Sequence, residues 1–321
     1  ILTGGPGTGN TFTTRTIVAL WKAMGKSIAL ASPTGRAAQR LGEVTGKEAT
    51  TIHRLLEFDP SKMRFKRDSD DPLPVDAVVV DEASMLDLFL AHSLLKAIPP
   101  TAQLLLVGDT DQLPSVGAGN VLGDLIDSAQ VPVLRLTQVF RQAQSSQIVQ
   151  NAYASNQGNY PALESVSESP ATDCLWLGAP EPEDGVHSIE MIVQELMPAL
   201  GIAAVKDVQV LCPMTRGAVG TRNLNQALQR VLNPPAPDKD EIGRGWLILR
   251  VGDRVIQRVK DYNREVVNGE LGTVVGVDLE EQEVTVLFDE RQVTYDRADL
   301  NEITLAWAVT IHKSQGSEYP V

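Results

Sequence analysis

The chain has 321 residues, a formal net charge of −13 and only two cysteines. This length suits about two or three domains with sizeable cores, and the few cysteines argue against a disulfide framework or a zinc site. No apolar run approaches the ~20 residues that span a bilayer, so we expect a soluble, cytoplasmic protein, and the acidic charge argues against a protein that coats DNA nonspecifically, because such binding depends on neutralising phosphates.

A glycine-rich loop lies near the start of the chain, between a short apolar strand and a helix predicted near Thr11–Met24. Residues Gly4–Thr11 match the pattern G-x-x-x-x-G-K-[ST] everywhere except at Asn10, where the pattern has lysine. In loops of this kind, backbone N–H groups surround phosphates and the positive end of the helix faces them. The sequence therefore predicts a triphosphate site without its mobile cation, and a tight strand-to-helix turn is the alternative interpretation.

Two further predicted strands end in polar residues. Val78–Val80 leads into Asp81 and Glu82, and Leu104–Val107 leads into a loop that contains Gln112. Because ligands of open α/β sheets bind at the carboxyl ends of the strands, we expect these side chains to lie beside the glycine-rich loop. Adjacent carboxylates there can divide two tasks, holding Mg²⁺ and activating water. The alternative is a pair of solvated carboxylates after a strand.

Strands and helices alternate through the first half of the chain, which predicts a doubly wound α/β domain. A polar stretch between Glu57 and Pro74 interrupts this alternation. Its Met63-x-Phe65 spacing predicts a small hairpin, and a solvated loop is the alternative. The predicted strands lie near Ile28–Ala31, Ala77–Asp81, Gln103–Val107 and Val133–Leu136, and the predicted helices near Thr11–Met24, Gly35–Thr45, Leu86–Ala97 and Ala118–Ser128.

The second half begins with a helix to about Asn156 and a connector rich in proline, serine and glutamate at Pro161–Thr172. Amphipathic helices near Val186–Leu200 and Leu224–Val231 then predict a second α/β unit. After them the period changes to that of short antiparallel strands with an Asn-Gly turn. These strands are predicted at Arg254–Val259, Gly272–Val277, Glu283–Phe288 and Gln292–Tyr295, before an α/β segment at Ile303–Val309.

Segments spread along the chain resemble, in order, the motifs of RecD-like superfamily 1 DNA helicases. The resemblance runs from the first residue to the last, and the order of the motifs together with the last of them makes it specific. The segments are Gly4–Gly9, Ser32–Ala38, Thr51–Leu55, Asp81–Ser84, Gly108–Pro114, Val139–Gln142 and Thr310–Tyr319.

This resemblance implies an α/β fold of two RecA-like P-loop NTPase domains, with ATP between them and single-stranded DNA across their tops. It implies a first domain at 1–140, with the hairpin insertion at about 57–74, and a second domain at 141–250 and 300–321, incomplete at its C-terminus. A small SH3-like β-barrel would be inserted at 251–299. The chain would also be cut at both ends, without the upstream glutamine that reads adenine and without a final arginine that reaches the γ-phosphate.

The same resemblance implies roles for individual residues. Glu82 would be the catalytic base and Gln112 would sense the γ-phosphate. Arg141 would stabilise the transition state from the second domain, and a surface salt bridge is the alternative for this arginine. Mg²⁺ would be held by Thr11 and Asp81. ATP would be bound by Gly5, Gly7, Thr8, Gly9, Asn10, Thr11, Gly316 and Glu318.

Small hydroxyls and isolated basic groups would line the DNA path, which suits a motor that must release phosphates in each cycle. For His53 alone, a half-buried structural imidazole is the alternative. The set comprises Pro33, Thr34, Arg36, His53, Thr215, Arg216, Thr310, His312 and Lys313.

Two functions of different class are consistent with these motifs. The first is an ATP-dependent 5′-to-3′ DNA helicase or translocase in DNA repair or recombination, which acts on single-stranded DNA and duplex junctions and can have partner subunits of a recombination complex. Asn10 and the cut ends would impair it. The second is an ATPase-inactive, single-stranded DNA-binding module derived from such a helicase. A P-loop kinase is disfavoured, because no acceptor-site feature accompanies the loop and the Thr310–Glu318 motif conflicts with it.

Overall fold

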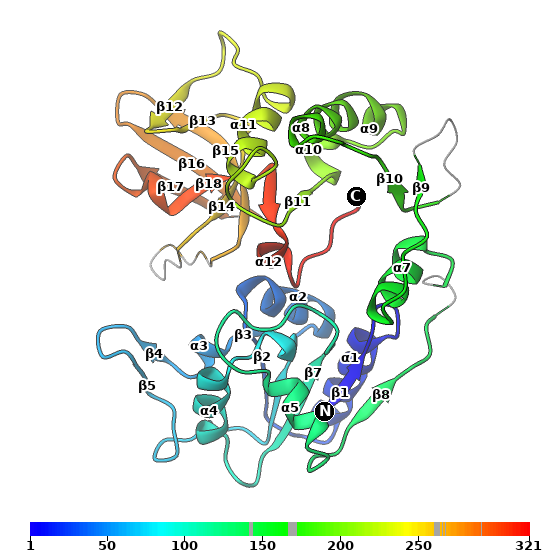
Figure 1. The fold of residues 1–321 in the computed structure, drawn as a ribbon. Coiled ribbons are helices and arrows are strands. Elements are labelled where there is room, and N and C mark those ends of the chain that lie inside the picture. The colour runs from blue at the N-terminus through cyan, green and yellow to red at the C-terminus, as the bar shows by residue number, and fades with distance from the viewer. Residues whose placement is uncertain (141–143, 166–171, 260–263, 265, 267, 290) are drawn as a thin grey trace. The chain divides into compact units, whose positions relative to one another are not determined.

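The structure is a computed structural model that describes residues 1–140, 144–165, 172–259, 264, 266, 268–289 and 291–321. The chain divides into two compact units, Ile1–Trp176 and Leu177–Val321. Figure 1 labels their helices and strands. The predicted domain boundaries, which rest on the family resemblance, stay predictions.

A wholly parallel sheet of six strands forms the centre of the first unit, in the order β3-β2-β6-β7-β1-β8. Its inner strands are rich in valine, leucine and alanine, as expected where helices cover both faces of a sheet. The strands predicted from the sequence are confirmed. They are β1 (Leu2–Gly4), β2 (Ile28–Ser32), β6 (Ala77–Val80), β7 (Gln103–Gly108) and β8 (Leu134–Leu136). The short edge strand β3 (Thr50–Thr51) was not predicted.

Helices pack against both faces of this sheet. In β6, Val78 and Val80 belong to the core that contains α4 and α5, whereas Val79 belongs to the core that contains α1 and α2. This alternation follows from the period of two residues along a strand. The helices and short elements of the unit are α1 (Asn10–Ala23), α2 (Gly35–Thr45), α3 (Ile52–Leu55), η1 (Ala83–Met85), α4 (Leu88–Ala97), α5 (Val121–Asp127), α7 (Gln147–Asn156), β9 (Glu164–Ser165) and β10 (Leu175–Trp176).

A two-stranded antiparallel hairpin interrupts the α/β pattern where the sequence predicts one. It consists of β4 (Phe58–Asp59) and β5 (Arg64–Phe65). Met63 lies in its turn with a φ angle of 50° and is 77% exposed. The hairpin therefore presents an apolar side chain at its tip.

The second unit combines a parallel pair of strands, β11 and β19, with a five-stranded antiparallel sheet of order β17-β16-β15-β14-β18. Phe288 and Tyr295, on neighbouring strands, are fully buried at the centre of the antiparallel core. The elements are α8 (Pro182–Met191), η2 (Ile192–Leu196), α9 (Met197–Ala199), α10 (Ala204–Asp207), β11 (Val210–Cys212), α11 (Thr221–Leu232), β12 (Glu241–Arg244), β13 (Leu247–Arg250), β14 (Arg254–Gln257), β15 (Leu271–Asp278), β16 (Glu283–Phe288), β17 (Arg291–Asp296), η3 (Asp299–Glu302), β18 (Ile303–Leu305), β19 (Ala308–Thr310) and α12 (Ile311–Ser314).

Among the helices that begin at other residues than the sequence analysis predicts, two have a clear local cause. The helix predicted from Ala118 begins at Val121, because Gly119 has a φ angle of 106° that a helix does not accommodate. The helix predicted from Val186 begins at Pro182, which occupies the first helical position, where its missing N–H is not needed. Both differences follow from local backbone geometry, which the spacing of apolar residues does not predict.

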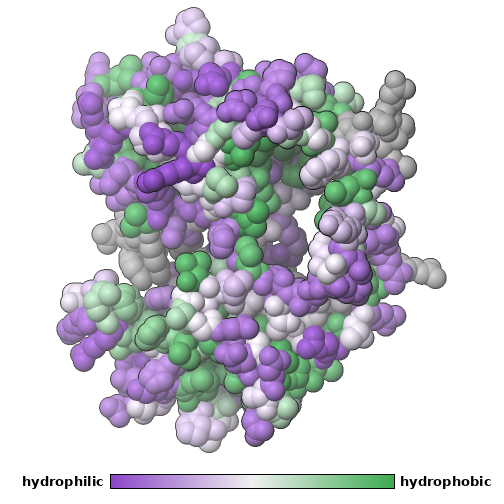
Figure 2. Space-filling view, viewed as in Figure 1, coloured by the Kyte–Doolittle hydropathy of each residue, from purple (hydrophilic) through white to green (hydrophobic). Residues whose placement is uncertain are grey.

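The surface mixes polar and apolar side chains. On the face drawn in Figure 2, hydrophilic residues cover most of the surface and hydrophobic ones lie between them. The described residues contain no helix whose length and hydropathy would let it cross a membrane.

Candidate nucleotide-binding and DNA-binding sites

The glycine-rich loop joins the end of β1 to the start of α1, as predicted. Gly7 and Gly9 have φ angles of 76° and 91°, which residues with a Cβ rarely adopt. No side chain caps the first N–H groups of α1, and Thr11 lies exposed in this first turn. Thr8 is buried, and its hydroxyl donates to the carbonyl oxygen of Gly5 at 2.7 Å. The loop therefore has the backbone geometry of an anion site at a helix N-terminus.

Asn10 turns its side chain back onto this loop. Its Nδ2 donates to the carbonyl oxygen of Gly4 at 2.6 Å, and its Oδ1 is buried without a hydrogen-bond partner among the described residues. A neutral amide bound to the loop brings no charge to a phosphate. In this chain, the side chain at the position that holds lysine in the general pattern therefore forms a hydrogen bond within the loop.

Carboxylates follow two other strands of the sheet that leads into the loop. Asp81 and Glu82 come after β6, and Asp109 comes after β7. Burial raises the pKa of Asp81 and of Asp109. Burial and the adjacent charge of Asp81 raise the pKa of Glu82 to about 7. Glu82 also has a positive φ angle of 53°, which is uncommon for a residue with a side chain and costs conformational energy.

The order β6-β7-β1 makes these strands neighbours, so their loops meet at one edge of the sheet. A bound cation would relieve the electrostatic cost of gathering these carboxylates there. In the described part of the chain, no group of three or more His, Cys, Asp or Glu side chains is arranged to hold a metal ion alone.

The remaining predicted nucleotide contacts are only partly placed. Gln112 is exposed in the loop after β7, where its backbone N–H donates to the carbonyl oxygen of Asp109 at 3.3 Å. Arg141 lies outside the described residues. Gly316 and Glu318 follow α12 in the second unit. The roles of all four in nucleotide binding stay predictions.

The predicted DNA-binding residues of the first unit follow two neighbouring strands. Strands β2 and β3 run parallel, with Ser32 opposite Thr51. Pro33, Thr34 and Arg36 come after β2, and His53 comes after β3. The hydroxyl of Thr34 caps α2 by accepting the N–H of Ala37 at 3.3 Å, and that of Thr51 caps α3 by accepting the N–H of Arg54 at 3.2 Å.

The second unit repeats this arrangement. Strands β11 and β19 run parallel, with Cys212 opposite Thr310. The exposed Thr215 and Arg216 follow β11, and His312 and Lys313 follow β19. The hydroxyl of Thr310 caps α12 by accepting the N–H of Lys313 at 3.4 Å. The segments Thr51–Arg54 and Thr310–Lys313 thus share the residues Thr-Ile-His, the strand end and the cap.

His53 is partly buried and belongs to an aromatic cluster. Its ring centroid lies 5.7 Å from that of Phe58 and 5.6 Å from that of Phe65, and the two phenylalanine centroids are 5.1 Å apart. The packing supports the structural interpretation of this imidazole. Because both phenylalanines belong to the hairpin, the same packing connects the hairpin to a predicted DNA-binding motif.

Sequence reasoning missed two cations near the predicted sites. Burial raises the pKa of Asp81 and of Glu82, and the charge of Arg40 on α2 partly opposes this rise. Arg40 lies one helical turn after Arg36, and this spacing is the feature of the sequence that could have predicted it. Arg258, after β14, donates to the carbonyl oxygen of Asn301 at 3.3 Å. Desolvation by the surrounding chain and then the charge of Arg258 lower the pKa of Lys313, although this lysine keeps more than a third of its surface exposed.

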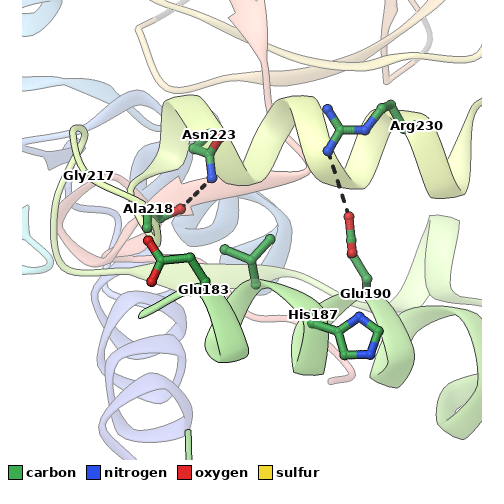
Figure 3. A pocket seen from close by; sticks show the side chains of 8 residues that line it. Glu183, His187, Glu190, Gly217, Ala218, Asn223 and Arg230 are labelled. Atoms are coloured by element: carbon green, nitrogen blue, oxygen red, sulfur yellow. Dashed lines mark hydrogen bonds and ion pairs between the residues drawn. The ribbon is translucent and has the colours of Figure 1, made fainter. Parts of the chain in front are cut away.

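A concavity of about 530 Å³ lies between α8 and α11 in the second unit (Figure 3). Glu183, His187 and Glu190 line it from α8, and Arg230 on α11 lies 3.9 Å from Glu190. The Nδ2 of Asn223 donates to the carbonyl oxygen of Ala218 at 2.6 Å. Two acidic side chains and only one arginine make a poor environment for phosphate, and no predicted site residue lines it.

Comparison with known proteins agrees with this geometry. The family model described as "AAA domain" matches residues 1–118, and the one described as "ATP-dependent RecD-like DNA helicase SH3 domain" matches residues 224–288. Over 99% of its length, the chain is 42% identical to a protein of Deinococcus radiodurans named "ATP-dependent RecD2 DNA helicase". The chain is similar to RecD-like helicases along almost its whole length. Its predicted α/β fold, with a P-loop domain and an SH3-like domain, is confirmed.

A second relative is a protein of Mycolicibacterium smegmatis named "RecBCD enzyme subunit RecD", 34% identical over 99% of the chain. The chain spans 42% of the length of the Deinococcus protein and 61% of that of the Mycolicibacterium protein. Solved structures of Pif1 helicases from Bacteroides, in complex with ADP-AlF3 and ssDNA, and from Candida albicans share the fold, with TM-scores of 0.57 and 0.56 and identities of 18% and 20%. They match 99% of this chain and cover 80% and 82% of their own.

Proposed function

We propose that this RecD-like chain forms the motor of an ATP-dependent DNA helicase that moves 5′ to 3′ along single-stranded DNA. One observation carries the proposal. The glycine-rich loop, the carboxylates and the Gln112 loop follow the neighbouring strands β1, β6 and β7, and the strands β2 and β3 that carry Thr34 and His53 continue the same parallel sheet. A motor must couple hydrolysis to its grip on DNA, and one rigid sheet can support both sites.

In the proposed reaction, backbone N–H groups of the loop bind the α- and β-phosphates, and Thr11 and Asp81 hold Mg²⁺. Bound Mg²⁺ neutralises charge that develops on the phosphate oxygens. Glu82 accepts the proton of the attacking water, and its pKa of about 7 suits a general base near neutral pH. Gln112 and Arg141 contact the γ-phosphate in this proposal.

The proposed partner is single-stranded DNA and its junction with duplex, in DNA repair or recombination in the cytoplasm. The hairpin with Met63 at its tip supports a duplex-splitting role next to the His53 motif. Because the Mycolicibacterium relative is named a subunit of the RecBCD enzyme, we also propose partner subunits for the whole protein.

Asn10 favours a second candidate, an ATPase-inactive module that still binds single-stranded DNA. Its amide is engaged with Gly4, so the loop contains no cation for the β- and γ-phosphates. Under this alternative the DNA-binding residues keep their function and the carboxylates do not contribute to turnover.

Phosphate release from Mg-ATP, with and without single-stranded DNA, separates the two candidates. The measurement compares this chain with its Asn10→Lys variant and with Asn10→Lys/Glu82→Gln. A motor impaired only at position 10 gains DNA-stimulated release in the Asn10→Lys variant and loses it again without Glu82. If the chain and its Asn10→Lys variant both bind DNA but neither releases phosphate, the binding module is correct. If neither of the two binds DNA, both candidates are wrong.

A further inference from the structure

Helix α7 contacts the outside of the glycine-rich loop. The hydroxyl of Tyr153 donates to the carbonyl oxygen of Pro6 at 3.1 Å. The approach is close, since a Cβ built on Gly5 would stand 2.8 Å from the same hydroxyl oxygen. Because a peptide unit is planar and trans, fixing the Pro6 carbonyl toward α7 leaves the N–H of Gly7 directed away from that helix.

One turn later, the same helix contacts the loop after β7. The Nδ2 of Asn156 donates to the Oδ2 of Asp111 at 2.6 Å. The backbone N–H of Asp111 in turn donates to the buried carboxylate of Asp109 at 3.0 Å. Residues three apart on a helix share a face, so Tyr153 and Asn156 reach the two loops from one surface of α7.

Phe140 adds a third contact from the segment before α7. Its backbone N–H donates to the carbonyl oxygen of Gly7 at 3.0 Å. Its ring lies against Gly9, where a Cβ would come within 2.6 Å of the ring. We call Phe140, Tyr153 and Asn156 together the clasp. The lack of a side chain at Gly5 and Gly9 therefore leaves room for the clasp, and Gly9 also has a positive φ angle.

We propose that the clasp positions the glycine-rich loop and the Gly108–Pro114 loop together for nucleotide. This proposal rests on the proposed function and deepens it. Tyr153 and Asn156 are positioning residues, since they act through backbone and carboxylate groups of the loops and not on the phosphates. Tyr153 acts on the loop for the α- and β-phosphates, and Asn156 acts on the loop predicted to sense the γ-phosphate.

The electrostatic setting is consistent with this role. A tyrosine hydroxyl keeps its proton at neutral pH, and burial and then the charges of Asp109 and Asp111 raise the pKa of Tyr153 further. A preorganised loop lowers the cost of ordering that nucleotide binding would otherwise meet. Tyr153 should then affect the binding of ADP and of ATP alike, whereas Asn156 should affect the binding of ATP more.

The test measures the affinity of the full chain carrying Asn10→Lys for Mg-ADP and for a nonhydrolysable Mg-ATP analogue. Tyr153→Phe removes only the hydroxyl, and Asn156→Asp replaces the donor by a carboxylate that repels Asp111. The controls are Tyr160→Phe, at a tyrosine that is 98% exposed, and Asn159→Asp, at an exposed asparagine. Asn156→Leu removes the donor without adding charge and serves as a second variant at that position.

We expect Tyr153→Phe to weaken both nucleotides alike, by about three- to tenfold, which is the usual effect of losing one hydrogen bond. Asn156→Asp and Asn156→Leu should weaken the ATP analogue more than ADP. Both controls should leave the affinities unchanged. Thermal unfolding midpoints, measured in parallel, show whether each variant folds: a structural role of Tyr153 would lower the midpoint, and a structural role of Asn156 would not distinguish ADP from the ATP analogue.

Two failures have different meanings. If the Asn10→Lys chain binds neither nucleotide, the proposed ATP-dependent function is overturned and the clasp proposal with it. If that chain binds both nucleotides and the clasp variants match their controls, the clasp proposal alone is overturned. Equal weakening of both nucleotides by the Asn156 variants would also contradict it, because Asn156 would then have no specific effect at the γ-phosphate.

Discussion

Position 10 lies at the start of α1, where a side chain can reach either a bound phosphate or the loop itself. Asn10 contacts the loop, through its 2.6 Å hydrogen bond to Gly4. The residue is only partly buried and belongs to none of the hydrophobic cores of the first unit. A substitution there should therefore change ligand binding more than folding.

We predict that Asn10→Lys raises the affinity for Mg-ATP by roughly 10- to 100-fold, since a hydrogen bond to a charged group is worth about 1.5–3 kcal/mol. The thermal unfolding midpoint without nucleotide should stay nearly unchanged. Nucleotide titration and thermal unfolding measure the two quantities. Asn10→Gln, which keeps a neutral amide, is the control and should bind no better than Asn10. Equal affinities of the lysine and glutamine variants would contradict the prediction.

Glu82 combines a buried carboxyl with a positive φ angle. Its pKa of about 7 lies above the ordinary value of 4.5, so the folded state favours the protonated form. The stability that follows from this preference is present in full below pH 4.5 and is lost as pH rises through about 7. At higher pH the folded chain must hold a charged and poorly solvated group beside Asp81.

We predict that Glu82→Gln stabilises the chain more at pH 8 than at pH 5, because the amide cannot ionise. Urea unfolding with EDTA and without nucleotide gives the free energy of unfolding at each pH. Glu48→Gln, at an exposed glutamate, is the control and should show no such difference. The same stability change for Glu82→Gln at both pH values would show that Glu82 does not titrate in this range.

Among the secondary-structure elements, the hairpin is the one that depends most on a few side chains. Its two strands are only two residues long, and a hairpin of this size is marginally stable alone. The rings of Phe58 and Phe65 pack on each other and on His53, which fixes the base of the hairpin to α3. The tip residue Met63 takes no part in this cluster.

We predict that Phe65→Ala lowers the free energy of unfolding by about 1–2 kcal/mol, because the variant buries less apolar surface and has no aromatic pairs at this position. Met63→Ala should change it by less than about 0.5 kcal/mol, as expected for an exposed side chain. Chemical denaturation of both variants measures the difference. If the two variants have the same stability, the aromatic cluster does not hold the hairpin.

Over the whole molecule, the distribution of charge favours DNA binding at a few fixed cations over nonspecific coating of DNA. The net charge is −13, yet Arg36 follows the end of β2 in the first unit and Lys313 follows the end of β19 in the second. A few cations at fixed positions can bind a single strand weakly and release it, whereas an acidic surface elsewhere repels duplex DNA.

We predict that single-stranded DNA binds without ATP and that Arg36→Ala/Lys313→Ala weakens binding to all sequences alike, because phosphate contacts carry no base information. The slope of log affinity against log salt should fall by about 0.7 for each phosphate that is no longer neutralised. Fluorescence anisotropy with a labelled oligonucleotide measures both effects. Lys96→Ala/Lys206→Ala removes one exposed lysine from each unit and is the control. Equal effects of the two double variants would place the DNA elsewhere.

The sequence by itself determined most of the central strands and helices of the first unit and proposed the residues of the sites, because both depend on local information. Apolar runs such as Val78–Val80 predicted the central strands, and polar residues at their ends predicted which loops would gather at one edge of the sheet. The spacing of Met63 and Phe65 predicted the hairpin. Ordered motifs then indicated the similarity to RecD-like helicases, including the residues proposed to bind ATP and DNA.

Only the tertiary structure decided how these residues contact one another. Tyr153 and Pro6 are separated by 147 positions, and no local pattern indicates that their atoms meet. The burial that raises the pKa of Asp109, and the action of Arg40 on the carboxylates, likewise arise from packing between distant elements. The folded loop likewise determines the side-chain rotamer of Asn10, which points toward Gly4. Hydrogen bonds and pKa values depend on three-dimensional neighbours, which the chain acquires only when its sheet and helices have packed.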